Sequence, residues 1–163
     1  MNEVDRLAEL EGYLYKFIEH CERISTFYDD FCKDADDLKK GKSYDLIVLA
    51  DIFTDFYTFT ETAFVRISKY FENNLDRERW HSHLLEKMVI DVPGIRKRVI
   101  SDHSYSMLLE FMKFRHFRRY YFEFEYDRDR MTYLEKKFME LLPLLKIEIQ
   151  EYILFCKDLQ SRV

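Results

Sequence analysis

The sequence predicts an all-α protein: an up-and-down antiparallel bundle of about five helices, with residues 1–163 forming one domain. Apolar residues recur at three- and four-residue spacing along most of the chain, and no stretch alternates convincingly with period two. Only 3 Gly and 2 Pro interrupt the 163 residues. Hydrophobic residues make up 47% and charged residues 35%, a mixture typical of amphipathic helices around a shared core.

The expected helices are separated by polar connections or by residues that break a helix. Ser43 and Asp76 are expected to cap the second and third helices, and Pro93 with Gly94 ends the third. Pro143 should bend the last helix or remove one of its hydrogen bonds. The expected helices span residues 2–31, 44–73 and 77–89, a central helix from a cap at Ser101 to about residue 125, and a last helix from a cap at Asp127 or Asp129 to about residue 160.

Two charged stretches are interpreted as solvent-exposed rather than functional. Residues 33–43 carry many charges and Gly41, so they are expected to form a solvated connection between the first two helices. Along the second helix, several charged residues lie off the apolar stripe and are expected to form a wet face. These residues are Asp45, Asp55, Glu61, Arg66 and Lys69.

Composition narrows the classes of function. The net charge of −5 argues against nucleic-acid binding by the whole surface, although it leaves room for a local basic patch. No apolar run reaches the about 18 residues that a membrane span needs. Cys21, Cys32 and Cys156 have no metal-type spacing, and their odd number without an apparent signal peptide favours free thiols in the cytoplasm.

No metal or cofactor is expected. There is no glycine-rich phosphate loop and no zinc-type cysteine spacing. His81 and His83 are two residues apart, so on a helix they point to different faces and make a poor pair of metal ligands.

The central helix holds the best candidate for a site. Between Phe111 and Phe122 there is no acidic residue, although the protein as a whole is acidic. At roughly 100° per residue, Arg118 falls in the middle of the apolar side and therefore needs an acidic partner, a helix end or a phosphate. The cations of this window are Lys113, Arg115, His116, Arg118 and Arg119, among six aromatic residues. The plainer alternative is a core helix whose arginines extend to solvent.

The sequence around this helix resembles the HepT-like branch of the HEPN superfamily. The segment VPGIRKRVISDHSYSMLLEFMKFRHFRRYYFEFEYDRDRM resembles that family's V-P-G-x-R…V-I-S loop and the following helix, which in the family carries an R-x4-H-x-Y motif. Upstream, FVRISKYFENNLDRERWHSHLLEKM is similar to its paired helix and W-H-x-x-L-L segment.

The resemblance implies a dimeric helical bundle and, in active members, a metal-independent ribonuclease toxin. Such toxins are commonly paired with a minimal nucleotidyltransferase antitoxin of the MNT type, which can transfer AMP to the motif tyrosine. The motif arginine falls on Arg115 and is followed by His116, but the histidine position holds Tyr120 and the tyrosine position holds Phe122. Two of the three motif residues are therefore changed.

This departure leaves three hypotheses open. The chain is a ribonuclease toxin acting through Arg115 with His116 or Tyr120, since RNA cleavage needs a base and a cation near the phosphate. Alternatively, it is an inactive HEPN module that binds RNA or an MNT-type partner, or a structural helical dimer of another lineage. RNA is expected at a basic cleft of a homodimer, with contacts from Lys113, Arg118, Arg119, Arg96 and Arg98. His116 is expected to point along the Tyr120 face, away from Arg115, and to reach the cleft from the second chain.

Overall fold

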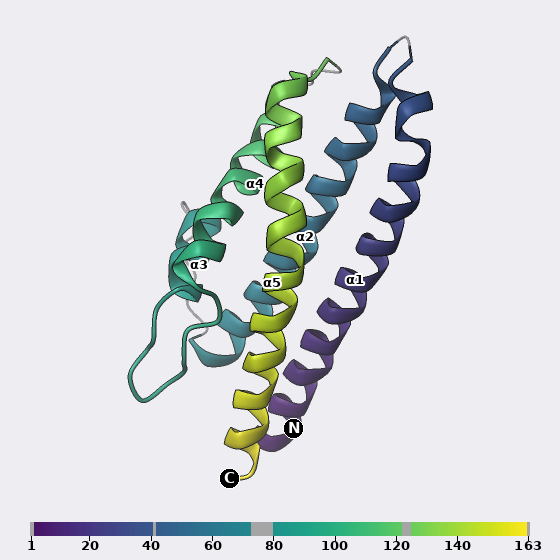
Figure 1. Ribbon diagram of the computed structural model, residues 1–163. Coiled ribbons are helices and arrows are strands. Elements are labelled where there is room, and N and C mark those ends of the chain that lie inside the picture. Colours follow the sequence, from purple (N-terminus) through teal and green to yellow (C-terminus); the bar gives the residue numbers. More distant parts are fainter. Residues whose placement is uncertain (1, 41, 73–79, 122–124, 163) are drawn as a thin grey trace.

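The computed structural model describes residues 2–40, 42–72, 80–121 and 125–162, and it confirms the all-α prediction. Within these residues the only strand-like pairing is an isolated bridge between Val92 and Arg96. The helices are α1 (Glu3–Leu38), α2 (Tyr44–Phe71), α3 (Trp80–Met88), α4 (Asp102–Tyr121) and α5 (Arg128–Gln160) (Figure 1). None of the described helices combines the length and the apolar character needed to cross a membrane.

The long helices run antiparallel to their neighbours, and α2 is the central one. Figure 1 shows α1 and α2 as an up-and-down pair, α4 and α5 as another, and both ends of the chain at the same end of the bundle. Within the described ranges, α2 packs against all four other helices, whereas α1 packs against α2 and α5 only. The side of α2 that α1 leaves uncovered therefore receives α3 and α4.

Aromatic side chains join α2, α4 and α5 at the middle of the core. Phe53 and Phe56 of α2 each lie 5.5 Å from Phe111 of α4, measured between ring centroids. Phe138 of α5 lies 5.8 Å from Phe53 and 5.3 Å from Phe56. These four rings are at most 1% exposed, and edge-to-face contacts of this kind add stability beyond the burial of apolar area. This cluster holds the inner face of α4 against the bundle, as its predicted apolar stripe requires.

The first helix is longer than predicted. The expected end near Phe31 is wrong because α1 continues to Leu38 through the charged stretch. No glycine or proline stands between residues 31 and 38, and lysine, alanine and leucine are good helix formers. Ion pairs three residues apart also support these turns: Asp30 with Lys33 at 2.9 Å, Asp36 with Lys39 at 3.2 Å and Asp37 with Lys40 at 2.7 Å.

The predicted caps have mixed outcomes. The carboxylate of Asp127 accepts a hydrogen bond from the Arg130 amide at 3.0 Å, and the Ser101 hydroxyl accepts one from the Ser104 amide at 3.2 Å, so these caps are confirmed. Ser43 is not a side-chain cap. Its backbone has φ 54° and ψ 47°, a left-handed conformation in which its side chain makes no capping bond.

Some predicted boundaries differ from the structure or lie outside the described residues. The cap at Asp76, the start of the third helix at residue 77, the end of the second helix at residue 73 and Phe122 all fall outside the described part of the chain. Glu125 is described and is not helical. Pro143 lies inside α5, which continues on both sides of it with one backbone N–H fewer.

Candidate functional site

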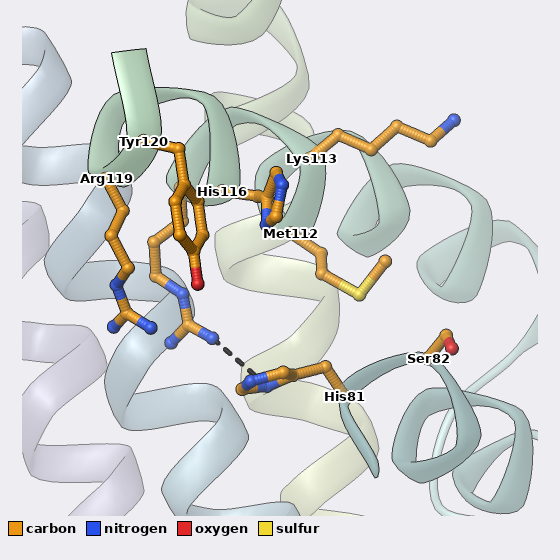
Figure 2. A pocket seen from close by; sticks show the side chains of 8 residues that line it. His81, Ser82, Met112, Lys113, His116, Arg119 and Tyr120 are labelled. Atoms are coloured by element: carbon orange, nitrogen blue, oxygen red, sulfur yellow. Dashed lines mark hydrogen bonds between the residues drawn. The ribbon is translucent and has the colours of Figure 1, made fainter. Parts of the chain in front are cut away.

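A cavity of about 450 Å³ lies between α3 and α4 on the side of α2 that α1 does not cover. Figure 2 shows His116, Arg119 and Tyr120 on α4 facing the side on which His81 lies. The lining residues are His81 and Ser82 of α3 with Met112, Lys113, Arg115, His116, Arg119 and Tyr120 of α4. The cavity therefore brings together all three residues predicted to be catalytic and two of those predicted to contact RNA.

Arg115 is fixed in the wall of this cavity by a buried carboxylate. Its Nη1 donates to Glu61 Oε1 at 3.0 Å and its Nη2 donates to Glu61 Oε2 at 2.8 Å. Nη1 also donates to the Thr58 hydroxyl at 3.3 Å. Arg115 is 8% exposed and Glu61 is 7% exposed, so each charge depends on the other for compensation inside the protein.

An aromatic ring and an imidazole complete the surroundings of this pair. The guanidinium carbon of Arg115 lies 4.6 Å from the centre of the Tyr57 ring. Burial, and then the neighbouring Glu61, raise the pKa of Tyr57, so the ring stays a neutral phenol beneath the cation. His81 Nδ1 lies 2.6 Å from Glu61 Oε2 and 3.4 Å from Arg115 Nη2. One carboxylate thus contacts both α3 and α4.

Sequence reasoning missed Glu61 and His81 as site residues. Glu61 was assigned to a solvated face, which is wrong, and the same correction applies to Asp45, which is 2% exposed. A signal was present, since Glu61 follows Tyr57 by four residues and Tyr57 belongs to the apolar stripe. A residue one turn from a fully buried ring lies at the edge of that stripe, where a partner on another helix can reach it.

His116 and Tyr120 form a tilted pair of rings on α4, on one face of the helix as their four-residue spacing predicts. Their ring centroids are 4.5 Å apart with an angle of 42° between the planes. The expectation that His116 points away from Arg115 is corrected, because both side chains line the same cavity of one chain. Tyr120 is 61% exposed, so much of its side chain is open to the surface.

No group of three or more His, Cys, Asp or Glu side chains that could hold a metal ion occurs in residues 2–40, 42–72, 80–121 and 125–162. The two buried thiols have another environment. Cys21 and Cys156 lie in the apolar core as predicted, and burial raises the pKa of each to about 12. They are inert at neutral pH.

The comparison with known families decides what kind of helical bundle this is. The family model described as HepT-like protein matches residues 48–156, which run from the second turn of α2 into the last turns of α5. The chain belongs to the HepT-like family. This family is part of the HEPN superfamily, in agreement with the resemblance found in the sequence. Searches of curated proteins and of solved structures found no match.

In this HepT-like protein the remaining predicted cations lie outside the cavity. Arg118 donates to the Ala50 carbonyl at 3.2 Å and to the Thr54 hydroxyl at 3.1 Å, and it forms an ion pair with Asp51. The acidic partner that its position requires is therefore supplied by α2.

The two loop arginines of the HepT-like chain have different surroundings. Arg96 is 4% exposed, and its Nε donates to Glu72 at 2.6 Å while Nη2 donates to the Lys87 carbonyl at 2.7 Å. Arg96 therefore holds the loop after α3 against the end of α2, and we leave it out of the proposed RNA-binding surface. Arg98 is exposed, and neither arginine lines the cavity.

Proposed function

We propose that this HepT-like protein is a toxin-like RNA-binding protein of the HEPN class that holds RNA in the cavity between α3 and α4. The observation that carries this proposal is the composition of the rim. Lys113, His116 and Arg119 line the same cavity as the exposed ring of Tyr120, on a chain whose net charge is −5. Cations beside an exposed aromatic ring suit a nucleotide, because the cations pair with phosphate and the ring stacks on a base.

Arg115 has a different part in this proposal from the exposed cations. Its two terminal nitrogens already donate to Glu61, so the pair carries little net charge toward the cavity. Phosphate contacts are therefore assigned to Lys113 and Arg119, and Arg115 supplies a fixed dipole in the wall. With so few available cations we expect weak binding with a modest dependence on salt, because the slope grows with the number of phosphate contacts.

We further propose that RNA cleavage is slow and needs no metal. RNA hydrolysis through the 2′-hydroxyl requires a base, and the position of the family's motif histidine holds Tyr120. A phenol of pKa about 10 keeps its proton at neutral pH and is a poor base. The second candidate function is an inactive module that pairs with an MNT-type antitoxin. The tyrosine at the position of the motif histidine favours this function as well.

RNA binding can be tested by fluorescence anisotropy with a labelled oligoribonucleotide over a range of salt concentrations. The double variant Lys113→Ala/Arg119→Ala should weaken binding at least about tenfold and flatten the salt dependence, because two phosphate contacts are lost. Lys16→Ala/Arg23→Ala is the matched control: it also removes one lysine and one arginine, from exposed positions on α1. Equal weakening by both double variants would show that RNA is not bound at this cavity.

A further inference from the structure

The arrangement of His81 is more specific than a helix contact requires. His81 is the second residue of α3, and its Nδ1 lies 2.6 Å from Oε2 of the buried Glu61. Its side chain is 37% exposed and lines the cavity beside Arg115 and Tyr120. Figure 2 shows the Tyr120 hydroxyl directed toward the space that His81 borders.

The short contact fixes which ring nitrogen of His81 carries the proton. A carboxylate at 2.6 Å must receive a hydrogen from Nδ1, because two lone pairs at that distance would repel. With Nδ1 protonated, the 3.4 Å approach of Arg115 Nη2 is a contact and not a hydrogen bond. The lone pair of the neutral ring then belongs to Nε2. The His81 side chain is 37% exposed and lines the cavity.

We propose that His81 is the general base for RNA cleavage in this protein, with Glu61 as its positioning residue. This inference rests on the proposed function, because it assumes that RNA lies in the cavity. A carboxylate that holds one imidazole nitrogen orients the ring and stabilises the imidazolium that forms when the other nitrogen takes a proton. The imidazole thus comes from α3, not from the motif position on α4.

The step can be written with all protons assigned. Nε2 of His81 takes the proton of a ribose 2′-hydroxyl, and the 2′-oxygen forms a bond to phosphorus. The bond between phosphorus and the 5′-oxygen breaks, and the leaving oxygen takes the proton of the Tyr120 hydroxyl. The products are a 2′,3′-cyclic phosphate and a 5′-hydroxyl, and the imidazolium and phenolate exchange protons with water. Because a phenol is a weak acid, this assignment agrees with slow cleavage.

The charges around His81 come from two packed helices. Glu61 on α2 is the anion, while Arg115, Lys113, Arg119 and His116 on α4 are the cations and the second imidazole. The cations balance the negative charge that grows on the phosphate as the 2′-oxygen attacks. The proposed base, acid and cations thus face one cavity from α3 and α4.

A purely structural role for His81 makes different predictions, and three variants distinguish it from the role of a general base. His81→Asn keeps a side-chain N–H that can donate to Glu61 but has no basic nitrogen. His81→Ala leaves a space that free imidazole can enter. His83→Ala is the matched control, since His83 lies on the same helix, is 40% exposed and is 3.9 Å from Glu86.

The experiment follows cleavage of a labelled oligoribonucleotide by the full chain, together with RNA affinity and thermal unfolding of each variant. We expect His81→Asn and His81→Ala to bind RNA as the unaltered chain does and to cleave it at least about a hundredfold more slowly. Added imidazole should restore part of the activity of His81→Ala and none of the activity of His81→Asn, and His83→Ala should retain full activity. The same oligonucleotide with 2′-O-methyl groups should remain intact throughout.

Several results would overturn the inference. Cleavage by His81→Asn at the unaltered rate excludes His81 as the base, and a loss in His81→Ala that imidazole does not restore assigns it a structural role. An unaltered chain that binds RNA but does not cleave it refutes this inference and the proposed slow cleavage, and it leaves the proposed RNA binding standing. A chain that binds no RNA refutes the proposed function itself.

Discussion

Tyr120 is the residue at which the chemistry of this cavity is most open to change. The gain expected from Tyr120→His comes from replacing the proposed acid, a phenol, by an imidazole, which gives and takes a proton near neutral pH. Part of that gain is lost to imperfect placement, since an error of about 1 Å can reduce the rate about a hundredfold. We therefore expect cleavage of a labelled oligoribonucleotide to rise by at least about tenfold.

The gain should depend on the rest of the cavity. Arg115→Ala in the Tyr120→His background should abolish it, whereas Tyr133→His, at a tyrosine of α5 that is 48% exposed, should produce none. Adding Phe122→Tyr should help only if its hydroxyl orients the phosphate. Brisk cleavage by the unaltered chain that survives Arg115→Ala would mean that the site is elsewhere.

The Arg115–Glu61 pair is expected to stabilise the fold as well as the cavity. Arg115→Met leaves the Glu61 carboxylate buried without its cation, and removing one partner of a buried pair typically lowers the free energy of unfolding by about 3–5 kcal/mol. Urea denaturation measures this loss, and the double variant Arg115→Met/Glu61→Gln should recover part of it. Lys33→Met breaks an exposed pair and should change stability by less than about 1 kcal/mol. Equal effects of the two single variants would contradict the assignment.

At the scale of single residues, the sequence predicted the α4 side of the cavity but not its partners on α2 and α3. The cationic window on α4 and the ring contact of His116 with Tyr120 could be predicted because both follow from spacing within one helix. Glu61 and His81 could not, because the contacts that define them join residues 54 and 20 positions apart. The periodicity of a helix says which side is apolar, but it does not say which polar residue at the edge of that side meets a partner.

Among the helices, the starts of α2 and α5 are joined by a second buried carboxylate. Asp45 is 2% exposed and receives hydrogen bonds from Arg128 at 2.7 and 3.0 Å. The hydrogen bonds from Arg128 hold the pKa of Asp45 below its usual value, and they outweigh burial, which would raise it. The unfolded chain, with a pKa of about 3.9 for an aspartate, therefore binds this proton more readily than the folded chain does.

We expect this contact to make the fold sensitive to acid. Its stabilising contribution is present above about pH 4 and is lost as the pH falls through the lowered pKa of Asp45. Asp45→Asn should be less stable than the unaltered chain at pH 7, and its stability should fall less between neutral pH and about pH 3. Urea midpoints measured along that range test this, with Asp36→Asn as control because that side chain is 96% exposed. Parallel curves for the two variants would contradict the proposed linkage.

Helix positions were predicted better than helix ends. Apolar periodicity located the five helices of the described part of the chain, because burial of one face is the main source of helix stability in a bundle. Apolar periodicity failed at the end of α1, because the apolar stripe ends near Phe31 but the helix continues to Leu38. Good helix formers and the ion pairs from Asp30 to Lys40 sustain two further turns, and Ala35 and Leu38 of these turns pack against the core.

For the whole molecule we expect a two-fold dimer in which the α4 helices of two copies face each other across the basic cleft. Light scattering after size exclusion should then report twice the 20.2 kDa of one chain. Arg119→Glu should shift the mass toward the monomer, whereas Lys16→Glu on α1 should not. A monomer at micromolar concentration would count decisively against this assembly.

A nucleotidyltransferase partner, if it acts on this chain, must use a residue other than the motif position. Phe122 has no hydroxyl, so AMP transfer cannot occur there, and Tyr120 and Tyr121 are the nearest acceptors in sequence. Mass spectrometry after co-expression with an MNT-type enzyme should find AMP on one of these tyrosines or find none. AMP at a distant residue would show that the motif is aligned wrongly.

Glu61 of α2 contacts residues of both α3 and α4, and this has a consequence for how such a chain can evolve. A substitution there alters the packing of both helices against α2, so a lineage that changes it risks losing the fold first. Lys113, Arg119 and Tyr120 stand on the exposed rim and can be exchanged while the frame persists. Substitutions at the rim can therefore change or abolish the activity of the cavity while the fold persists. A tyrosine at position 120 beside an intact Arg115–Glu61 pair is the kind of sequence that such substitutions produce.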